Sequence, residues 1–412
     1  MMHMSRVVVA TLLLMFVAGC TQGSGEPAAS KSPASAGADG QSALRAAALS
    51  LVERRSDALR SGDRDAFIAT VDPRETEFLE TQTRWFDNLA ALPIATIGLR
   101  LGDEDDMTRI SADGDYQLPV EFALQLEGYD EHPVTQPMVY RFSANGDDVL
   151  LTADRNVQSD ARSGWRPAPW DVTAIEVRTT DSVLGVFDAN TAKSADEIMT
   201  DVGDSVAHLK GVVPPWSNRV VAYAIENVDA LDKMSLMEVS RTGGVAFPVP
   251  TKPGSERIAA YRLALNPAAI ADDTFRGVLI RHEVGHAALG GLDDSSPTWL
   301  VEGSAEYLGL RSLPTARVRD FFRELAVSYT TFPLAAGRKF YEVRSTRNYN
   351  SASLVCSFLA ETLGPETLWS LMRAFERSGY VSQADIDDIV RRELGRTTRQ
   401  LGEDARAWAL AG

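Results

Sequence analysis

Two histidines four residues apart constrain the fold of this 412-residue chain more than any other feature. On a helix, His282 and His286 lie one turn apart on the same face, so both imidazoles can bind one metal ion. Glu283 stands between them, where a carboxylate can act on a water molecule held by that metal. An apolar run precedes this pair and two glycines follow it, which predicts a helix of about residues 274–289, buried on one side. The sequence therefore predicts a zinc site on a rigid helix.

The next segment offers a third ligand. A Ser-Pro pair predicts the N-cap and first position of a second helix, over about residues 298–307. Glu302 follows His286 by sixteen residues, which lets the chain turn and return antiparallel to the first helix. Glu302 is then the expected third ligand, and the fourth tetrahedral position stays open for water. Glu306, one turn later, can accept the free ring N–H of a zinc histidine.

A rival for the third ligand is Asp293, because other zinc hydrolases take a ligand from just after the helix. The pattern that uses a later histidine fails, since Leu289 and Leu292 occupy the positions that need glycine and histidine. We expect Asp293 to be a loop or turn residue and prefer Glu302 as the ligand.

The motif of residues 282–286, followed by Trp-Leu-Val-Glu-Gly-Ser-Ala-Glu-Tyr at 299–307, resembles the gluzincin metallopeptidases, the clan of thermolysin-like enzymes and aminopeptidase N. It is most similar to the peptidase MA-like branch. The resemblance is strong over 277–309 and weaker over 172–412. It implies a Zn²⁺ cofactor with Glu302 as a ligand, and Glu306 as a residue that contacts a metal ligand but not the metal. It also implies a domain with a small sheet, a zinc helix and a C-terminal α-helical cap.

The resemblance also bears on the type of peptidase. In aminopeptidase N a motif ahead of the zinc helix carries a glutamate that holds the substrate's amino terminus, but residues 243–248 here contain no acid. The missing acid favours an endopeptidase. Its substrate would lie extended along residues 243–248 and pair with their backbone as an added strand. No histidine follows the zinc motif, so another residue must stabilise the oxyanion. Tyr349 is the candidate by its resemblance to the aminopeptidase N tyrosine, with Tyr341 and Arg347 as weaker substitutes.

The amino terminus predicts export. Residues 1–20 contain an arginine, a short apolar run and small residues before Cys20, which is typical of a signal peptide and resembles a bacterial lipobox. Lipidated Cys20 would anchor the protein to the cell membrane on its extracytoplasmic face; the alternative is an ordinary secretory signal. Residues 21–41, rich in Gly, Ala, Ser and Pro, predict a flexible linker. Cys356 lies in an apolar run and is expected in the core.

The remaining pattern predicts an α+β protein. Residues 42–160 are expected to form a nuclear-transport-factor-like, cone-shaped domain, with helices followed by an antiparallel meander. A linker at 161–171 leads to the metallopeptidase domain at 172–412. Before the zinc helix, the patterns predict helices at 43–60, 63–70, 74–89 and 194–209, and strands at 94–101, 116–126, 134–142, 149–153, 173–178, 182–187 and 219–225. After it, they predict helices at 315–327, 350–363, 366–376, 384–394 and 398–410.

Together these features favour a membrane-anchored zinc peptidase acting on a peptide or protein substrate. The net charge of −16 argues against a nucleic-acid partner. Two alternatives stay open: a cell-surface binding or scaffold protein with an inactive or weakly active peptidase domain, and a zinc hydrolase with a non-peptide substrate.

Overall fold

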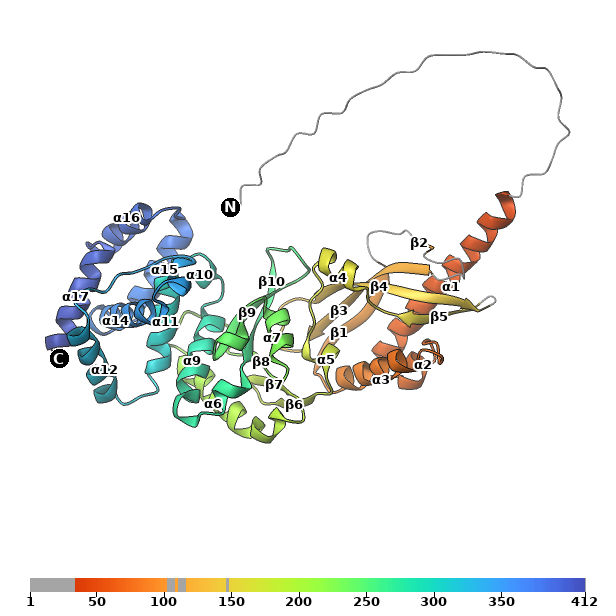
Figure 1. The fold of residues 1–412 in the computed structure, drawn as a ribbon, viewed down its shortest axis with the longest axis horizontal. Coiled ribbons are helices and arrows are strands. Elements are labelled where there is room, and N and C mark those ends of the chain that lie inside the picture. The colour runs from red at the N-terminus through yellow and green to blue at the C-terminus, as the bar shows by residue number, and fades with distance from the viewer. Residues whose placement is uncertain (1–33, 102–107, 110–115, 146–147, 412) are drawn as a thin grey trace, which may run out of the picture. The chain divides into compact units, whose positions relative to one another are not determined.

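The computed structural model describes residues 34–101, 108–109, 116–145 and 148–411. The fold is α+β, as the sequence predicts, and the described residues form two five-stranded sheets (Figure 1). The predicted signal peptide, Cys20 and residues 21–33 of the predicted linker lie outside the described residues. Residues 34–41, also expected in the linker, are helical instead and extend α1, although they include two glycines.

The first sheet follows three helices and is antiparallel throughout. Its strands run in the order β1-β3-β4-β5, with β2 paired to β3. Alternate residues of β3 are buried, as expected for a strand with one face on a core. The bounds of β1 and β3 match the prediction. The elements are α1 (Ala34–Ser61), α2 (Arg64–Ile68), α3 (Thr76–Ala90), β1 (Ile94–Leu101), β2 (Thr108–Arg109), β3 (Tyr116–Leu126), β4 (Val134–Asn145) and β5 (Asp148–Ala153).

A fully buried arginine lies in the core of this part. The Arg55 guanidinium donates hydrogen bonds to Thr70 Oγ1 at 2.6 Å and to Gln82 Oε1 at 2.5 Å, and lies over the Phe67 ring at 3.9 Å. Gln82 in turn donates to Asp154 at 2.7 Å. These partners satisfy a charge that would otherwise be costly to bury.

The second sheet has mixed strand directions, in the order β6-β7-β8-β10-β9. Strands β7, β8 and β10 are parallel neighbours, and β6 and β9 are antiparallel to the strands they pair with. Every residue of β7 and β8 is buried, which indicates that both faces of this sheet are covered. The strands are β6 (Glu176–Thr179), β7 (Val183–Phe187), β8 (Val220–Ala224), β9 (Gly244–Pro250) and β10 (Ile258–Leu265).

Different elements cover the two faces of the second sheet. One face, with Ala222 and Leu263, packs in the same core as α6 (Ala195–Leu209) and α9 (Asp273–Leu289). The opposite face, with Tyr223 and Phe247, packs in the same core as the first sheet. The two predicted domains therefore share a hydrophobic core instead of being joined only by a linker.

The predicted linker, 161–171, overlaps the end of one short helix, α4 (Val157–Ser163), and most of another, α5 (Pro169–Val172). Asn156 caps the first, and Pro169 occupies the first turn of the second, where its missing N–H costs nothing. Asn88 on α3 donates hydrogen bonds to the carbonyls of Trp170 and Thr173. These bonds fix the segment to α3, which packs on the first sheet. A linker was therefore the wrong description of residues 161–171.

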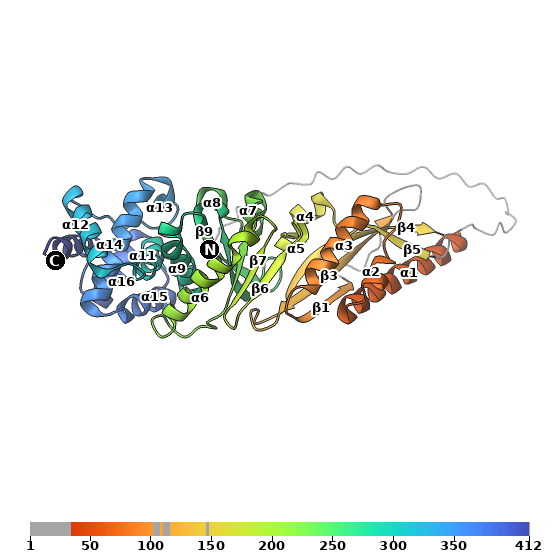
Figure 2. The ribbon, with the colours of Figure 1, turned by 90° about the horizontal axis from the view of Figure 1, so that it is seen from below.

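After α9 the described chain is helical, and these later helices lie beyond α9 from the second sheet (Figures 1 and 2). They contain the predicted helices, and two short ones, at 291–294 and 339–342, were not predicted. Cys356 is fully buried among them, as expected. Elements not yet named are α7 (Val228–Ser235), α8 (Pro267–Ile270), α10 (Gly291–Asp294), α11 (Thr298–Leu310), α12 (Thr315–Ser328), α13 (Lys339–Glu342), α14 (Ser345–Leu363), α15 (Glu366–Ser378), α16 (Gln383–Leu394) and α17 (Thr398–Ala411).

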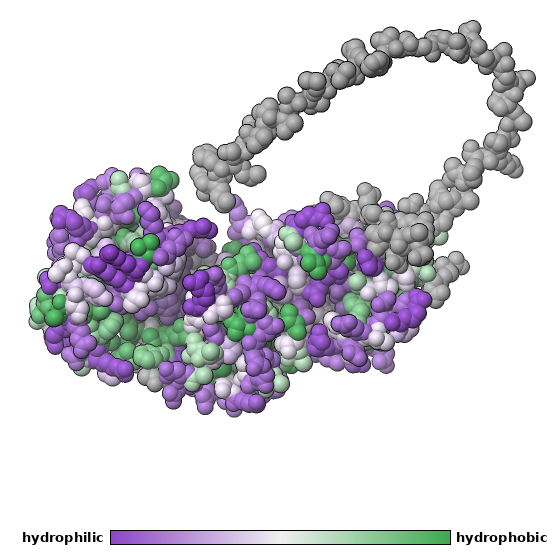
Figure 3. All heavy atoms as spheres, viewed as in Figure 1, coloured by the Kyte–Doolittle hydropathy of each residue, from purple (hydrophilic) through white to green (hydrophobic). Residues whose placement is uncertain are grey.

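The visible surface is mostly hydrophilic, with hydrophobic residues in scattered groups (Figure 3). Scattered apolar residues are normal on a protein surface and mark no site by themselves. Within the described part of the chain, none of the helices combines the length and apolar character needed to cross a membrane.

Candidate metal centre

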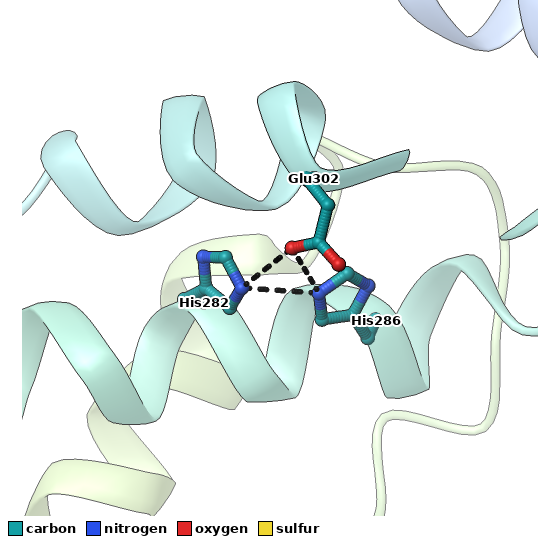
Figure 4. Close-up of side chains that lie close together, drawn as sticks. All are labelled: His282, His286 and Glu302. Carbon is teal, nitrogen blue, oxygen red and sulfur yellow. Dashed lines mark hydrogen bonds and ion pairs between the residues drawn. The ribbon is translucent and has the colours of Figure 1, made fainter. Parts of the chain in front are cut away.

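Close helix packing brings Glu302 to the two histidines. Glycines stand where α11 crosses its neighbours: a Cβ on Gly285 of α9 would lie 3.0 Å from the Leu308 side chain, and one on Gly309 would lie 2.9 Å from the Val278 carbonyl oxygen. On the other side of α11, a Cβ on Gly303 would lie 2.6 Å from the Ala352 carbonyl oxygen of α14. A Cβ at Gly303 or Gly309 would meet backbone, and one at Gly285 would press on the Leu308 side chain, so these glycines let α11 fit between α9 and α14 with Glu302 facing the histidines (Figure 4).

Three ligand-type atoms converge at this crossing. His282 Nε2 and His286 Nε2 are 3.1 Å apart, and Glu302 Oε2 lies 3.5 Å from the first and 3.6 Å from the second (Figure 4). A tetrahedral zinc ion about 2.0–2.2 Å from each ligand would hold such atoms about 3.3–3.6 Å apart. The donor set and its spacing therefore fit Zn²⁺ without rearrangement beyond a few tenths of an ångström.

The outer nitrogens of both rings face carboxylates. His286 Nδ1 lies 2.7 Å from Asp293 Oδ2, and His282 Nδ1 lies 3.5 Å from Glu306 Oε1. A carboxylate that accepts the Nδ1 hydrogen leaves the Nε2 lone pair free for a metal. The sequence predicts Glu306 beside one of the two zinc histidines, and in the structure its neighbour is His282. Asp293 was expected to be a turn residue or a rival ligand; instead it contacts the ring nitrogen that faces away from the other two ligand atoms.

The charges of this cluster shift the pKa values of its members. Burial lowers the pKa of His282, but the hydrogen bond to Glu302 and the nearby carboxylates raise it more, so the net shift is upward. The pKa of His286 is raised well above its usual value, because Asp293 and Glu302 outweigh burial. Burial raises the pKa of Glu302, but its hydrogen bonds with the two histidines dominate and hold it far below the usual range. The buried pocket therefore favours positive charge beside Glu302.

Glu283 is buried beside the cluster, next to strand β9. Burial raises the pKa of its carboxyl, and a hydrogen bond from the Ala246 backbone N–H opposes that rise. A Cβ on Gly244 would lie 3.2 Å from Glu283 Cγ, so the absence of a side chain there lets the glutamate reach the strand. The carboxylate lies within electrostatic range of both histidines but is separate from the three converging atoms.

Two tyrosines lie on the other side of Glu302. The Tyr341 hydroxyl donates to Glu302 Oε1 at 2.6 Å, so the two carboxylate oxygens face different partners. Tyr349 lies within range of the charges of Glu302, Glu283 and Glu306; burial, the largest cause, and these charges raise its pKa. Tyr349 was expected at the start of a helix and lies one turn inside α14. Arg347, the other candidate, donates to Thr331 instead.

The sequence indicated Asp293 as a rival ligand or turn residue and Tyr341 as a substitute oxyanion donor, but it did not predict their contacts with His286 and Glu302. Asp293 reaches His286 because Gly290, with a positive φ of 53°, ends α9 and turns the chain back. Tyr341 lies on the four-residue helix α13, too short to show a hydrophobic period. Comparisons of the chain with protein-family models and with curated proteins gave no match.

Proposed function

We propose that this protein is a zinc-dependent peptidase of the gluzincin type that hydrolyses peptide bonds within polypeptides. The observation that carries the proposal is the convergence of His282, His286 and Glu302, with ligand atoms within 4.8 Å of one another, beside a buried Glu283. Donors of this kind, with histidine outer nitrogens held by carboxylates, are typical of catalytic zinc sites. The amino terminus supports a lipid anchor on Cys20 and an extracytoplasmic location.

Bound by these three residues, Zn²⁺ would supply Lewis-acid activation of a water molecule and of the scissile carbonyl. Glu283 takes the proton from the attacking water and gives it to the leaving amine. Its buried carboxyl, with a raised pKa, is suited to holding a proton between the two steps. The Ala246 N–H orients the carboxylate.

We give the two tyrosines different roles, one in stabilising the oxyanion and the other in positioning Glu302. Tyr349 interacts with both Glu302 and Glu283, and so lies beside the space where water and carbonyl would meet. We assign it the hydrogen bond to the oxyanion. Tyr341 donates to Glu302 Oε1 and keeps Oε2 towards the histidines. No carboxylate occurs at residues 243–248 to hold a substrate amino terminus, which supports an endopeptidase.

Metal removal tests the proposal. Purified protein is incubated with casein and with a mixed peptide pool, with and without a zinc chelator. We expect new amino termini within the chains, loss of cleavage in chelator and recovery on adding zinc. Absence of cleavage from a fully zinc-loaded protein would contradict the peptidase proposal and favour a binding protein. Cleavage unaffected by chelator would contradict the metal's role.

A further inference from the structure

A second cavity lies away from the metal centre, between the two sheets. It is partly enclosed, has a volume of about 80 Å³, and is bounded by α3, β3 and β4 on one side and by β8, β9 and β10 on the other. The segment before α5 contributes to its wall. Most of its lining is apolar or aromatic, including Trp85, Phe122, Met138, Trp165, Tyr223 and Phe247.

The size of the cavity limits its occupant. A cavity of about 150 Å³ in another protein holds one benzene ring. A space of about 80 Å³ is about half that volume but is open on one side, so it accommodates one aliphatic side chain, and it is too small for a nucleotide-sized cofactor.

The charged groups around the cavity already have partners. Asp171 accepts from Trp85 Nε1 at 2.9 Å and from the Ala168 N–H at 2.7 Å. Arg262 donates to Asp130 at 2.9 Å, and the Arg155 guanidinium lies over the Trp165 ring at 4.3 Å. Because the Asp171 carboxylate and the Arg262 and Arg155 guanidiniums have these partners, and most of the lining is apolar, the cavity favours an apolar group over an ionic one.

Strand β9 connects the cavity to the metal centre. Its residue Ala246 donates its N–H to Glu283, and its last four residues, 247–250, line the cavity. Four residues of strand span about 13 Å. In the described part of the chain, β9 pairs with β10 alone and is therefore an edge strand. An extended polypeptide laid along this edge with a peptide bond at the metal centre would bring a residue about four positions away to the cavity.

The edge of β9 is poorly suited to holding a peptide by backbone alone. The Asn266 N–H donates to the Gly243 carbonyl where β9 and β10 begin to pair, and hydrogen-bonded positions alternate along an antiparallel pair, so positions 246 and 248 face away from β10. Position 248 is Pro248, which has no N–H, and Pro250 also lacks one. Affinity in this half of the strand must therefore come from a side-chain pocket.

We propose that the cavity is a subsite for one large apolar side chain of a polypeptide substrate, about four residues from the scissile bond and always on the same side of it. This inference rests on the proposed peptidase function and adds a sequence preference to it.

The test introduces a phenylalanine whose ring lies either inside the cavity or outside it. Gln136 on β4 lines the cavity, and Gln136→Phe fills it; Thr135→Phe adds the same ring to the opposite face of the same strand and is the matched control. Thermal unfolding of both full-length variants verifies folding. Each is given a defined peptide mixture, and the products are sequenced by mass spectrometry.

We expect the wild type and Thr135→Phe to prefer leucine or methionine at one position three to five residues from the cut by at least fivefold. Gln136→Phe should lose this preference and still cleave peptides too short to reach the cavity. No such preference in the wild type, or one that survives in Gln136→Phe, would overturn the subsite.

A second measurement separates the subsite from the peptidase function. Binding of N-acetylleucinamide to zinc-free protein is followed by ligand-observed NMR. Saturable binding that Gln136→Phe abolishes and Thr135→Phe retains supports the cavity as an apolar side-chain site, whatever the state of the metal. If binding is found but the zinc-loaded protein cleaves no peptide, the peptidase function fails and the substrate subsite fails with it. If peptides are cleaved but nothing binds, only the subsite fails.

Discussion

Two buried polar clusters in this protein differ in how their charges are balanced. Arg262 on β10 donates to both carboxylate oxygens of Asp130, at 2.9 and 3.1 Å, and to the hydroxyl of Tyr223. His282, His286 and Glu302 instead direct two ring nitrogens and a carboxylate oxygen at one small space. In the first cluster each carboxylate oxygen of Asp130 has a donor, and only the Arg262 Nε atom lacks a partner. In the second cluster, two ring nitrogens and a carboxylate oxygen face one another, and they need a cation between them, either a proton or a metal ion. This need for a cation distinguishes a metal-binding site from a structural ion pair.

The largest effect should come from removing the base beside the second cluster. Glu283→Gln keeps the shape of the side chain and the contact with β9 but removes the proton acceptor. We expect peptide hydrolysis to fall about 10²–10⁴-fold, with zinc content unchanged. Substantial remaining hydrolysis by the zinc-loaded variant would show that Glu283 is not the base.

Breaking the first cluster should affect stability instead. Asp130→Ala leaves the buried charge of Arg262 without its carboxylate; the two side chains are 0% and 6% exposed. We expect a loss of about 3–5 kcal/mol in unfolding free energy, measured by denaturant titration, without change in zinc affinity.

The control for this change is Asp57→Ala, which removes the partner of Arg60 in an exposed pair. It should change stability by less than about 1 kcal/mol. A loss for Asp130→Ala as small as that of the control would mean that the Arg262 cluster does not hold the two sheets together.

A smaller effect on the metal centre is expected from the carboxylate behind His286. Asp293→Asn weakens the acceptor at Nδ1, and we expect zinc affinity to fall about 10–100-fold in competition with a chelating dye. Asp294→Asn is the matched control, because the neighbouring carboxylate contacts Tyr261 at 3.3 Å instead of a histidine. Equal affinities for the two variants would contradict the role given to Asp293.

The same contrast explains what the sequence could and could not predict. The histidines and Glu302 belong to two consecutive helices with strong patterns, so spacing and motif were enough to predict that their side chains meet. Asp130 and Arg262 lie 132 residues apart and have no local signal that joins them. Strand β10 was missed for a related reason: a buried arginine interrupts its apolar run, and only the distant aspartate makes its burial acceptable.

Local sequence patterns also could not predict that the two expected domains share a hydrophobic core. Prolines and a glycine at 164–169 suggested a linker, because such residues often end regular structure. In the folded chain this segment packs against α3 and the second sheet, with Trp170 buried against Tyr223. The cavity exists only because elements more than a hundred residues apart form that core.

Zinc content measured on purified wild-type protein and on Glu302→Ala tests the central claim most directly. Both proteins are equilibrated with excess zinc, freed of unbound metal and analysed by atomic emission, with Glu306→Ala as the control for loss of a nearby carboxylate. The account predicts one zinc per wild-type chain, weaker retention in Glu306→Ala and loss of zinc in Glu302→Ala. A wild type that binds no zinc, or a Glu302→Ala variant that keeps a full equivalent, would contradict the three-residue site.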